Sequence, residues 1–195
     1  MRKLTFAKTD ESKKASIWVK HIPSFDPQKI TAREAISMMM LVLRPSDQDI
    51  FYPFIGDLLT EIGLTVRVTR GGDTNNRVDA IVIDQTHSIP IEIKSPTEVE
   101  DINIKSIKQA LENKIVFLSR KFYPSTRLTT TLAIGYYPPE KRSGVNELIE
   151  NFFNTYGINV GYIDLQKLLE LNWSHSFEGK YFDFTTLINL RGIYQ

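Results

Sequence analysis

Two carboxylates and an amine lie in neighbouring apolar segments near the middle of the chain. Asp79 belongs to the run VDAIVI (78–83), and Glu92 and Lys94 alternate with isoleucines in IPIEIK (89–94). A charge inside an apolar strand is unfavourable by several kcal/mol unless it is paired, hydrogen-bonded or bound to a metal. Carboxylates suit a hard divalent cation, and an ammonium group suits the negative charge of a reacting phosphate.

These three side chains share one site only if the two segments pair in a particular register. Side chains two apart on a strand lie on the same face, so Glu92 and Lys94 point the same way. Asp79 joins them when it lies opposite Glu92, which also sets Asp84 opposite His87 around a two-residue turn. A slip of one residue would move Asp79 to the other face. The sequence therefore predicts a hairpin with this register.

The elements around the hairpin follow from caps and periodicity. Thr31 and Glu34 form a capping-box pattern that predicts a helix over 32–43, and a second helix is expected from the segment 46–49 to Gly63, with Pro53 kinking it or lying in its first turn. Further expected elements are strands over 64–68, 129–136 and 158–163, and helices over 102–119, 145–156 and 165–171. The 102–119 helix is expected to bury the face of Ile104, Ile107, Leu111 and Ile115. This order indicates one α/β domain around a mixed sheet.

Composition limits the classes of protein that remain. The chain has 195 residues and no cysteine, so a disulfide framework and a thiolate zinc site are both excluded. Neither a secretory start nor an apolar run near 18 residues is present, which predicts a cytoplasmic protein without a membrane segment. The formal net charge of +1 argues against tight binding to nucleic acid through bulk charge alone.

The order of helix, glycine, strand, Gly71-Gly72 loop, Asp79, Glu92 and Lys94 resembles the PD-(D/E)XK nuclease superfamily. Val78-Asp79 stands where that pattern has Pro-Asp, and Glu92-Ile93-Lys94 matches (D/E)XK. Within the superfamily, residues 46–171 are similar to FokI-type cleavage domains of Type IIS restriction endonucleases. The resemblance implies a single nuclease domain over 1–195 with a restriction-endonuclease-like α/β core, in which helices flank a mixed central sheet. Residues 1–45 would be a helical N-terminal extension and 172–195 a C-terminal extension.

The same resemblance implies a Mg²⁺-dependent DNA endonuclease. Asp79 and Glu92, with the carbonyl of Ile93, would hold Mg²⁺, and Lys94 would orient the attacking water or stabilise the developing charge. Asp57, on the helix before the sheet, matches the place of an auxiliary acid in many such nucleases, although a solvent-facing helix residue explains it equally well.

Three further polar residues near this motif are weaker candidates. Gln109 follows the motif on a helix that could reach the site, but a polar side chain that faces the solvent is the simpler interpretation. Ser95 and Glu98 could touch DNA or water near Lys94, and nothing in the sequence separates them from ordinary loop residues.

The expected partner is double-stranded DNA. The low net charge favours a small catalytic subunit of a heterodimeric Type IIS enzyme, which cuts one strand while a larger subunit recognises the site and cuts the other. A stand-alone homodimeric restriction endonuclease is the alternative, and a junction-resolving or repair nuclease would carry the same three residues. An inactive DNA-binding or assembly subunit is the non-enzymatic alternative, which the intact motif disfavours.

Overall fold

The computed structural model describes residues 16–69, 78–121 and 123–194, and in these ranges six strands form one mixed sheet in the order β1-β2-β3-β4-β5-β6. The strands are β1 (Val66–Val68), β2 (Ala80–Val82), β3 (Ile89–Ile93), β4 (Thr131–Gly135), β5 (Val160–Asp164) and β6 (Gly192–Ile193). The first three are antiparallel neighbours, and β3 to β6 run parallel. The expected mixed sheet is thereby confirmed, whereas the Gly71-Gly72 loop lies outside the described residues.

The hairpin register expected from the sequence is confirmed. Ala80 pairs with Ile91 and Val82 with Ile89, so the same register sets position 79 opposite 92. Both strands are buried along their described length, although β2 is shorter than the 78–83 run. A slip of one residue would move Ile89, Ile91 and Ile93 out of the core that they share and put Glu92 into it, so burial favours this register.

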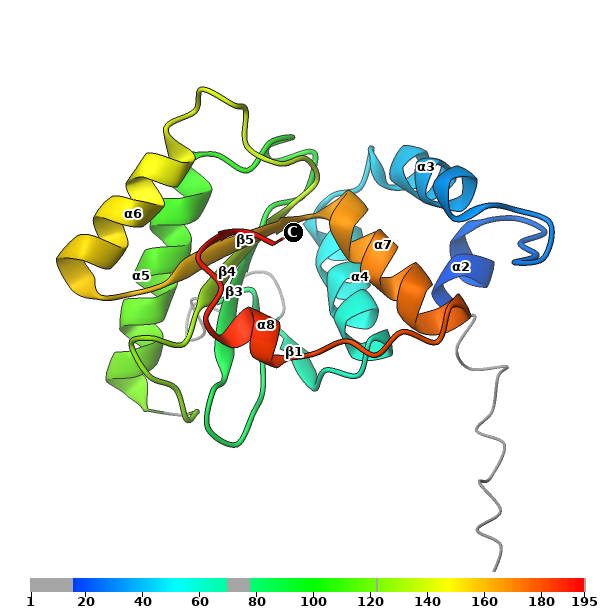
Figure 1. Ribbon diagram of the computed structural model, residues 1–195. Coiled ribbons are helices and arrows are strands. Elements are labelled where there is room, and N and C mark those ends of the chain that lie inside the picture. Colours follow the sequence, from blue (N-terminus) through cyan, green and yellow to red (C-terminus); the bar gives the residue numbers. More distant parts are fainter. Residues whose placement is uncertain (1–15, 70–77, 122, 195) are drawn as a thin grey trace, which may run out of the picture.

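Helices cover both faces of the sheet (Figure 1). One side carries α5 (Ile104–Arg120) and α6 (Val145–Tyr156). The other side carries α2 (Ser16–His21), α3 (Ala32–Leu43), α4 (Gln48–Glu61) and α7 (Leu165–Phe177). A short helix, α8 (Thr185–Ile188), precedes β6. No helix in the described ranges is long and apolar enough to cross a membrane.

Local sequence signals set the ends of the helices before the sheet. Thr31 and Glu34 form the predicted capping box of α3. Asp47 caps α4 by accepting a hydrogen bond from the Ile50 amide, and Pro53 lies inside the helix. After α4, Gly63 adopts φ +97°, a left-handed conformation that glycine takes without a steric penalty. The predicted positions of both helices are thus confirmed.

Alternation along β3 divides its side chains between the two helical layers. Ile89, Ile91 and Ile93 are fully buried in the core shared with α3, α4 and α7. A second core packs α5 and α6 against the opposite face and includes Ile107 of α5. Glu92 lies on this second face, where it meets α5. The charged site therefore sits between the sheet and α5.

The predicted buried face of α5 is partly wrong. Ile107 and Leu111 are buried, but Ile104 is 40% exposed and Ile115 is 48% exposed. The helix is turned so that a different stripe meets the sheet, consisting of Ala110, Lys114, Phe117 and their neighbours on that side. The small Ala110 lets the helix approach closely, and the Thr131 hydroxyl donates a hydrogen bond to the Ala110 carbonyl.

The C-terminal region was harder to predict. The helix expected over 165–171 continues to Phe177, because Trp173 and Phe177 pack against Trp18 of α2. After α8, the chain returns to the sheet as β6 beside β5. This last strand has two residues, too few to show any periodicity in the sequence.

Candidate active site

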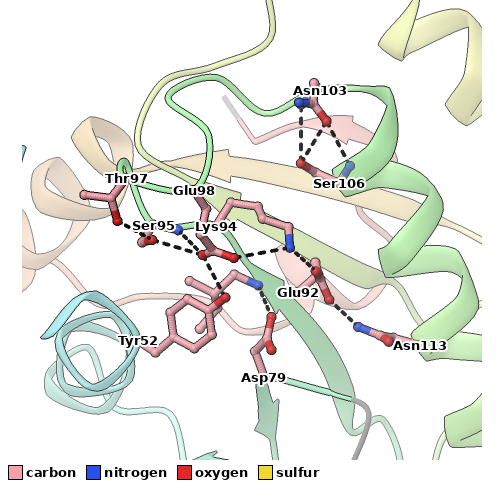
Figure 2. Close-up of polar contacts among 11 residues, drawn as sticks. Tyr52, Asp79, Glu92, Lys94, Ser95, Thr97, Glu98, Asn103, Ser106 and Asn113 are labelled. Carbon is pink, nitrogen blue, oxygen red and sulfur yellow. Dashed lines mark hydrogen bonds and ion pairs between the residues drawn. The ribbon is translucent and has the colours of Figure 1, made fainter. Parts of the chain in front are cut away.

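The fold brings Asp79, Glu92 and Lys94 together at one end of the β2–β3 hairpin (Figure 2). Glu92 belongs to β3, and Lys94 and Asp79 directly flank the two strands. The Asp79 Oδ2 accepts a hydrogen bond of 2.8 Å from the Ile93 amide, and the Lys94 Nζ lies 2.8 Å from the Glu92 Oε1. The predicted convergence of these three residues is present, and their catalytic and metal-binding roles stay predictions.

Glu92 is held from two sides. Glu92 is 5% exposed. Its Oε1 pairs with the Lys94 Nζ, and its Oε2 accepts a 2.6 Å hydrogen bond from the Asn113 Nδ2. Asn113 comes from α5 and is itself buried. The sequence reasoning did not find Asn113, because the expected face of α5 was rotated away from it. Asn113 lies between Glu112 and Lys114, so no signal in the sequence marked it as buried.

The surroundings of Lys94 keep it protonated. Burial lowers the pKa of this amine, but the hydrogen bond and charge of Glu92, with the charges of Glu98 and Asp79, outweigh burial and raise the pKa above its ordinary value. The Lys94 side chain is 13% exposed. It therefore presents a fixed positive charge at neutral pH in a site that is largely shielded from water.

Glu98 is a fourth member of the cluster, supplied by the turn after β3. Its Oε2 accepts hydrogen bonds from the Ser95 amide at 2.9 Å, the Ser95 hydroxyl at 3.0 Å and the Tyr52 hydroxyl at 3.0 Å. Its Oε1 lies 3.8 Å from the Lys94 Nζ. Burial raises the pKa of Glu98, but the Ser95 hydrogen bonds and the Lys94 charge leave it below its usual range.

The signal for Glu98 was present in the sequence. Ser95 and Glu98 have the Ser-x-x-Glu spacing of a capping box, which folds the glutamate back onto the serine amide. That turn aims the carboxylate at Lys94, four residues before Glu98. Tyr52 of α4 carried no such signal, because only packing of α4 against the sheet brings its hydroxyl to Glu98.

Glu92 lies close enough to Asp79 to oppose the ionisation of Asp79. Burial, followed by the charge of Glu92, raises the pKa of Asp79 to about 7, and the hydrogen bond from Ile93 only partly offsets this. The negative charge on these two carboxylates is thus incompletely compensated, although Lys94 contributes. A bound cation would relieve this repulsion.

The oxygen atoms present fit a hard divalent cation. In a strand, the N–H and C=O of one residue point to the same side, so the Ile93 carbonyl faces the Asp79 side as its amide does. Asp79, Glu92 and this carbonyl thus offer only oxygen ligands. Among the described residues, no group of three or more acidic, histidine or cysteine side chains is arranged to hold a metal. Mg²⁺ needs only one or two protein carboxylates, because water and phosphate oxygens complete its octahedron.

The structure does not bring Asp57 into this cluster. Asp57 is exposed on α4, and its charge acts on His21 of α2, where it opposes the lowering of the His21 pKa by burial and by Lys20. Tyr52 is the α4 residue that reaches the site. Asp57 follows Tyr52 by five positions, which places the two side chains about 140° apart around the helix.

Gln109 lies one helical turn before Asn113 on the same side of α5. Its Oε1 is buried and has no hydrogen-bond partner in the part of the chain that the structure describes. A buried acceptor without a donor is unfavourable by about 1–3 kcal/mol, so this oxygen is suited to a water or ligand donor.

Comparison with known proteins shows the fold and no more. No family model matches the sequence, and no curated protein matches it. A solved structure of the restriction endonuclease FokI is similar, with a TM-score of 0.60 and 12% identity over 97% of this chain and 35% of the FokI chain. FokI bound to DNA gives a TM-score of 0.59 with 12% identity over 97% and 34% of the two chains. This chain thus spans about a third of FokI, and its fold is restriction-endonuclease-like. The similarity extends well beyond the segment 46–171 that resembles such cleavage domains in sequence.

Proposed function

We propose that this protein is a Mg²⁺-dependent DNA endonuclease of the restriction type, with Asp79, Glu92 and Lys94 as its catalytic residues. The observation that carries the proposal is the charge cluster at the end of β3, where an ammonium group lies 2.8 Å from Glu92 and Asp79 is anchored to the intervening Ile93 amide. The FokI-like fold supports it, because FokI is a restriction endonuclease.

In the proposed reaction, each residue has a distinct task. Mg²⁺ bound by Asp79, Glu92 and the Ile93 carbonyl would offset phosphate charge and lower the pKa of a water molecule. Lys94 orients the attacking water or stabilises the negative charge that develops on the phosphate. The water oxygen forms a bond to phosphorus as the bond from phosphorus to the 3′ oxygen breaks, which yields a 5′ phosphate and a 3′ hydroxyl. Asn113 keeps the Glu92 carboxylate in its orientation.

We further propose that the chain acts as the catalytic part of a larger assembly and cuts one strand. A net charge of +1 gives little of the phosphate attraction on which non-specific DNA affinity depends. One active site hydrolyses one strand in each encounter, so a double-strand break needs a second site. A larger subunit that recognises DNA would supply both affinity and the second cut.

The test is a nicking assay of the purified chain on supercoiled DNA with Mg²⁺, at high protein concentration and low salt, where non-specific binding is strongest. We expect nicked circles from the wild type and none from Glu92→Ala. Asp57→Asn is the matched control, because it removes a carboxylate from the exposed side of α4, and it should nick at the wild-type rate. Undiminished nicking by Glu92→Ala would overturn the proposed site.

The same assay separates the possible assemblies. Efficient site-specific double-strand cleavage by the chain alone would favour a homodimer over the subunit arrangement. Preferential cutting of a four-way junction over linear duplex would favour a junction-resolving nuclease. Binding to DNA without any cutting, across Mg²⁺ concentrations, would leave an inactive assembly subunit.

A further inference from the structure

Lys94 has two carboxylates within reach but is in close contact with only one of them. The Lys94 Nζ lies 2.8 Å from the Glu92 Oε1 and 3.8 Å from the Glu98 Oε1 (Figure 2). The Glu92 side chain is 6% exposed and that of Glu98 is 25% exposed. Glu98 is thus a second anionic partner for Lys94, at a distance too long for a close ion pair.

Hydrogen bonds hold the Glu98 carboxylate in an orientation that suits a contact with Lys94. All three of its hydrogen-bond donors, the Ser95 amide, the Ser95 hydroxyl and the Tyr52 hydroxyl, bond to Oε2. The orientation of the carboxylate is therefore fixed from the far side, and Oε1 faces Lys94. Tyr52 is 6% exposed, so α4 supports this arrangement from within the protein.

Binding of a cation to Glu92 would change the balance of charge around Lys94. Without a cation, the charge of Glu92 is balanced by Lys94. When the same carboxylate binds a divalent cation, the ammonium group and the cation repel each other across it. A positive charge in such a shielded site then needs another anion.

We propose that Glu98 is a positioning residue that receives the Lys94 ammonium group when Glu92 turns to a bound divalent cation. The inference rests on the proposed function, because it assumes that Glu92 is a ligand. The required shift is small, since the two distances of 3.8 and 2.8 Å differ by 1.0 Å. The lysine stem has four flexible carbons and accommodates such a movement. Lys94 would then stand beside the cation without competing for its ligand.

The simpler role for Glu98 is to close the turn at Ser95. Glu98→Gln separates the two roles, because glutamine also serves in a capping box and still offers an oxygen to Ser95 and Tyr52. What this substitution removes is the charge that faces Lys94. A purely structural glutamate would therefore tolerate it.

The first experiment is a double-mutant cycle read by calorimetric titration with Ca²⁺, which reports ion binding without hydrolysis. In the full chain, Glu98→Gln should weaken Ca²⁺ binding about tenfold, as is common for residues that orient metal ligands. In a Lys94→Met background, the same substitution should change binding by less than about twofold, because the lysine it acts through is gone.

Glu100→Gln is the matched control for general charge, because Glu100 pairs with Arg44 at 3.2 Å on the surface. It should change Ca²⁺ binding little in either background. An equal loss from Glu98→Gln in both backgrounds would mean that the charge acts directly on the ion, which overturns the proposal. An unchanged affinity in the wild-type background would overturn it as well.

A second experiment does not depend on ion binding or cleavage. Glu92→Gln neutralises Glu92 as a cation would, so a crystal structure of this variant without divalent ions should show Lys94 Nζ about 2.8 Å from the Glu98 Oε1. A lysine that stays at its present distance from Glu98 would contradict the inference. If the wild type neither binds ions nor nicks DNA, the proposed nuclease function fails, and the Glu92→Gln structure still decides whether Glu98 is the alternative partner.

Discussion

Two lysines in the layer between α5 and the sheet differ sharply in their surroundings. Lys94 lies among three carboxylates, those of Glu92, Glu98 and Asp79, and its side chain is 13% exposed. Lys114 of α5 is fully buried, and its Nζ donates a 2.7 Å hydrogen bond to the Ser125 hydroxyl.

The neighbours decide the charge of each amine. Burial lowers the pKa of Lys94, but Glu92 and the other carboxylates outweigh burial and raise the pKa above its ordinary value. Burial without a carboxylate lowers the pKa of Lys114 to about 7. The Ser125 hydroxyl donates its own hydrogen bond to the Ser88 carbonyl and accepts one from Lys114, so it adds no negative charge beside the amine. Of these two amines, Lys94 is therefore the one that stays fully protonated at neutral pH.

The largest expected effect is on cleavage. Lys94→Ala should lower the nicking rate at least about 100-fold, as loss of one group that stabilises transition-state charge commonly does. Asp79→Ala and Glu92→Ala should be at least as severe, because each removes a carboxylate of the proposed ion site. Lys114→Met should keep the rate within about threefold, since it removes an amine that lies outside the cluster. A Lys94→Ala variant as active as Lys114→Met would erase the distinction between the two lysines.

The next effect concerns the support of Glu92. Asn113→Leu removes the 2.6 Å hydrogen bond to Glu92 and should weaken Ca²⁺ binding about 10- to 100-fold in calorimetric titration. Asn159→Ser is the control, because Asn159 is a buried asparagine that bonds to the Leu128 carbonyl instead. Equal affinities for the Asn113→Leu variant and the wild type would show that Glu92 does not need this partner.

The lowered pKa of Lys114 should make the free energy of unfolding depend on pH. Its folded-state pKa, about 7, lies below the value of roughly 10.4 expected in the unfolded chain. Between these values the unfolded chain binds more protons, so stability should rise with pH by up to about 1.4 kcal/mol per pH unit. Urea unfolding of wild type and Lys114→Met from pH 7 to 9.5 measures this. The variant should lose the slope, and parallel curves would contradict the lowered pKa.

Asp79 should give a slope of the opposite sign over a lower range. Its folded-state pKa, about 7, lies above the value of about 3.9 expected in the unfolded chain. The folded protein therefore binds more protons between pH 4 and 7, and stability in the absence of divalent ions should fall as pH rises through that range. Asp79→Asn should flatten this part of the curve. Saturating Mg²⁺ should also raise stability most near pH 7. A wild-type stability curve that rises from pH 4 to 7 and is unaltered by Asp79→Asn would refute the raised pKa of Asp79.

The sequence by itself determined the features that depend on neighbours along the chain. Strict alternation places Glu92 and Lys94 on one face, and the short connection 83–88 sets which residue of the first strand lies opposite them. The capping residues of α3 and α4 and the glycine after α4 follow from backbone hydrogen bonds that must be satisfied at helix ends. Each of these rules acts over a few residues, so the local sequence is sufficient.

Only the tertiary structure decided which side of each helix meets the site. Tyr52 rather than Asp57 points from α4 to the cluster. On α5, Asn113 reaches Glu92, whereas Ile104 and Ile115 of the predicted face are exposed. Ile104 and Ile115 were a poor guide because the helix turns so that Ile107 and the small Ala110 pack into the core against the sheet. The rotation of a helix is set by the fit of its whole surface to a distant partner, which no local pattern encodes.

The charge states of the lysines also belong to the tertiary structure. In the sequence, Lys114 is an ordinary helix residue between Asn113 and Ile115, and nothing along the chain marks it as buried. Lys94 owes its charge to carboxylates brought together by strand pairing, by the turn at Ser95 and by the support of Tyr52. A pKa depends on burial and on charges nearby in space, so identical side chains acquire different properties only once the chain has folded.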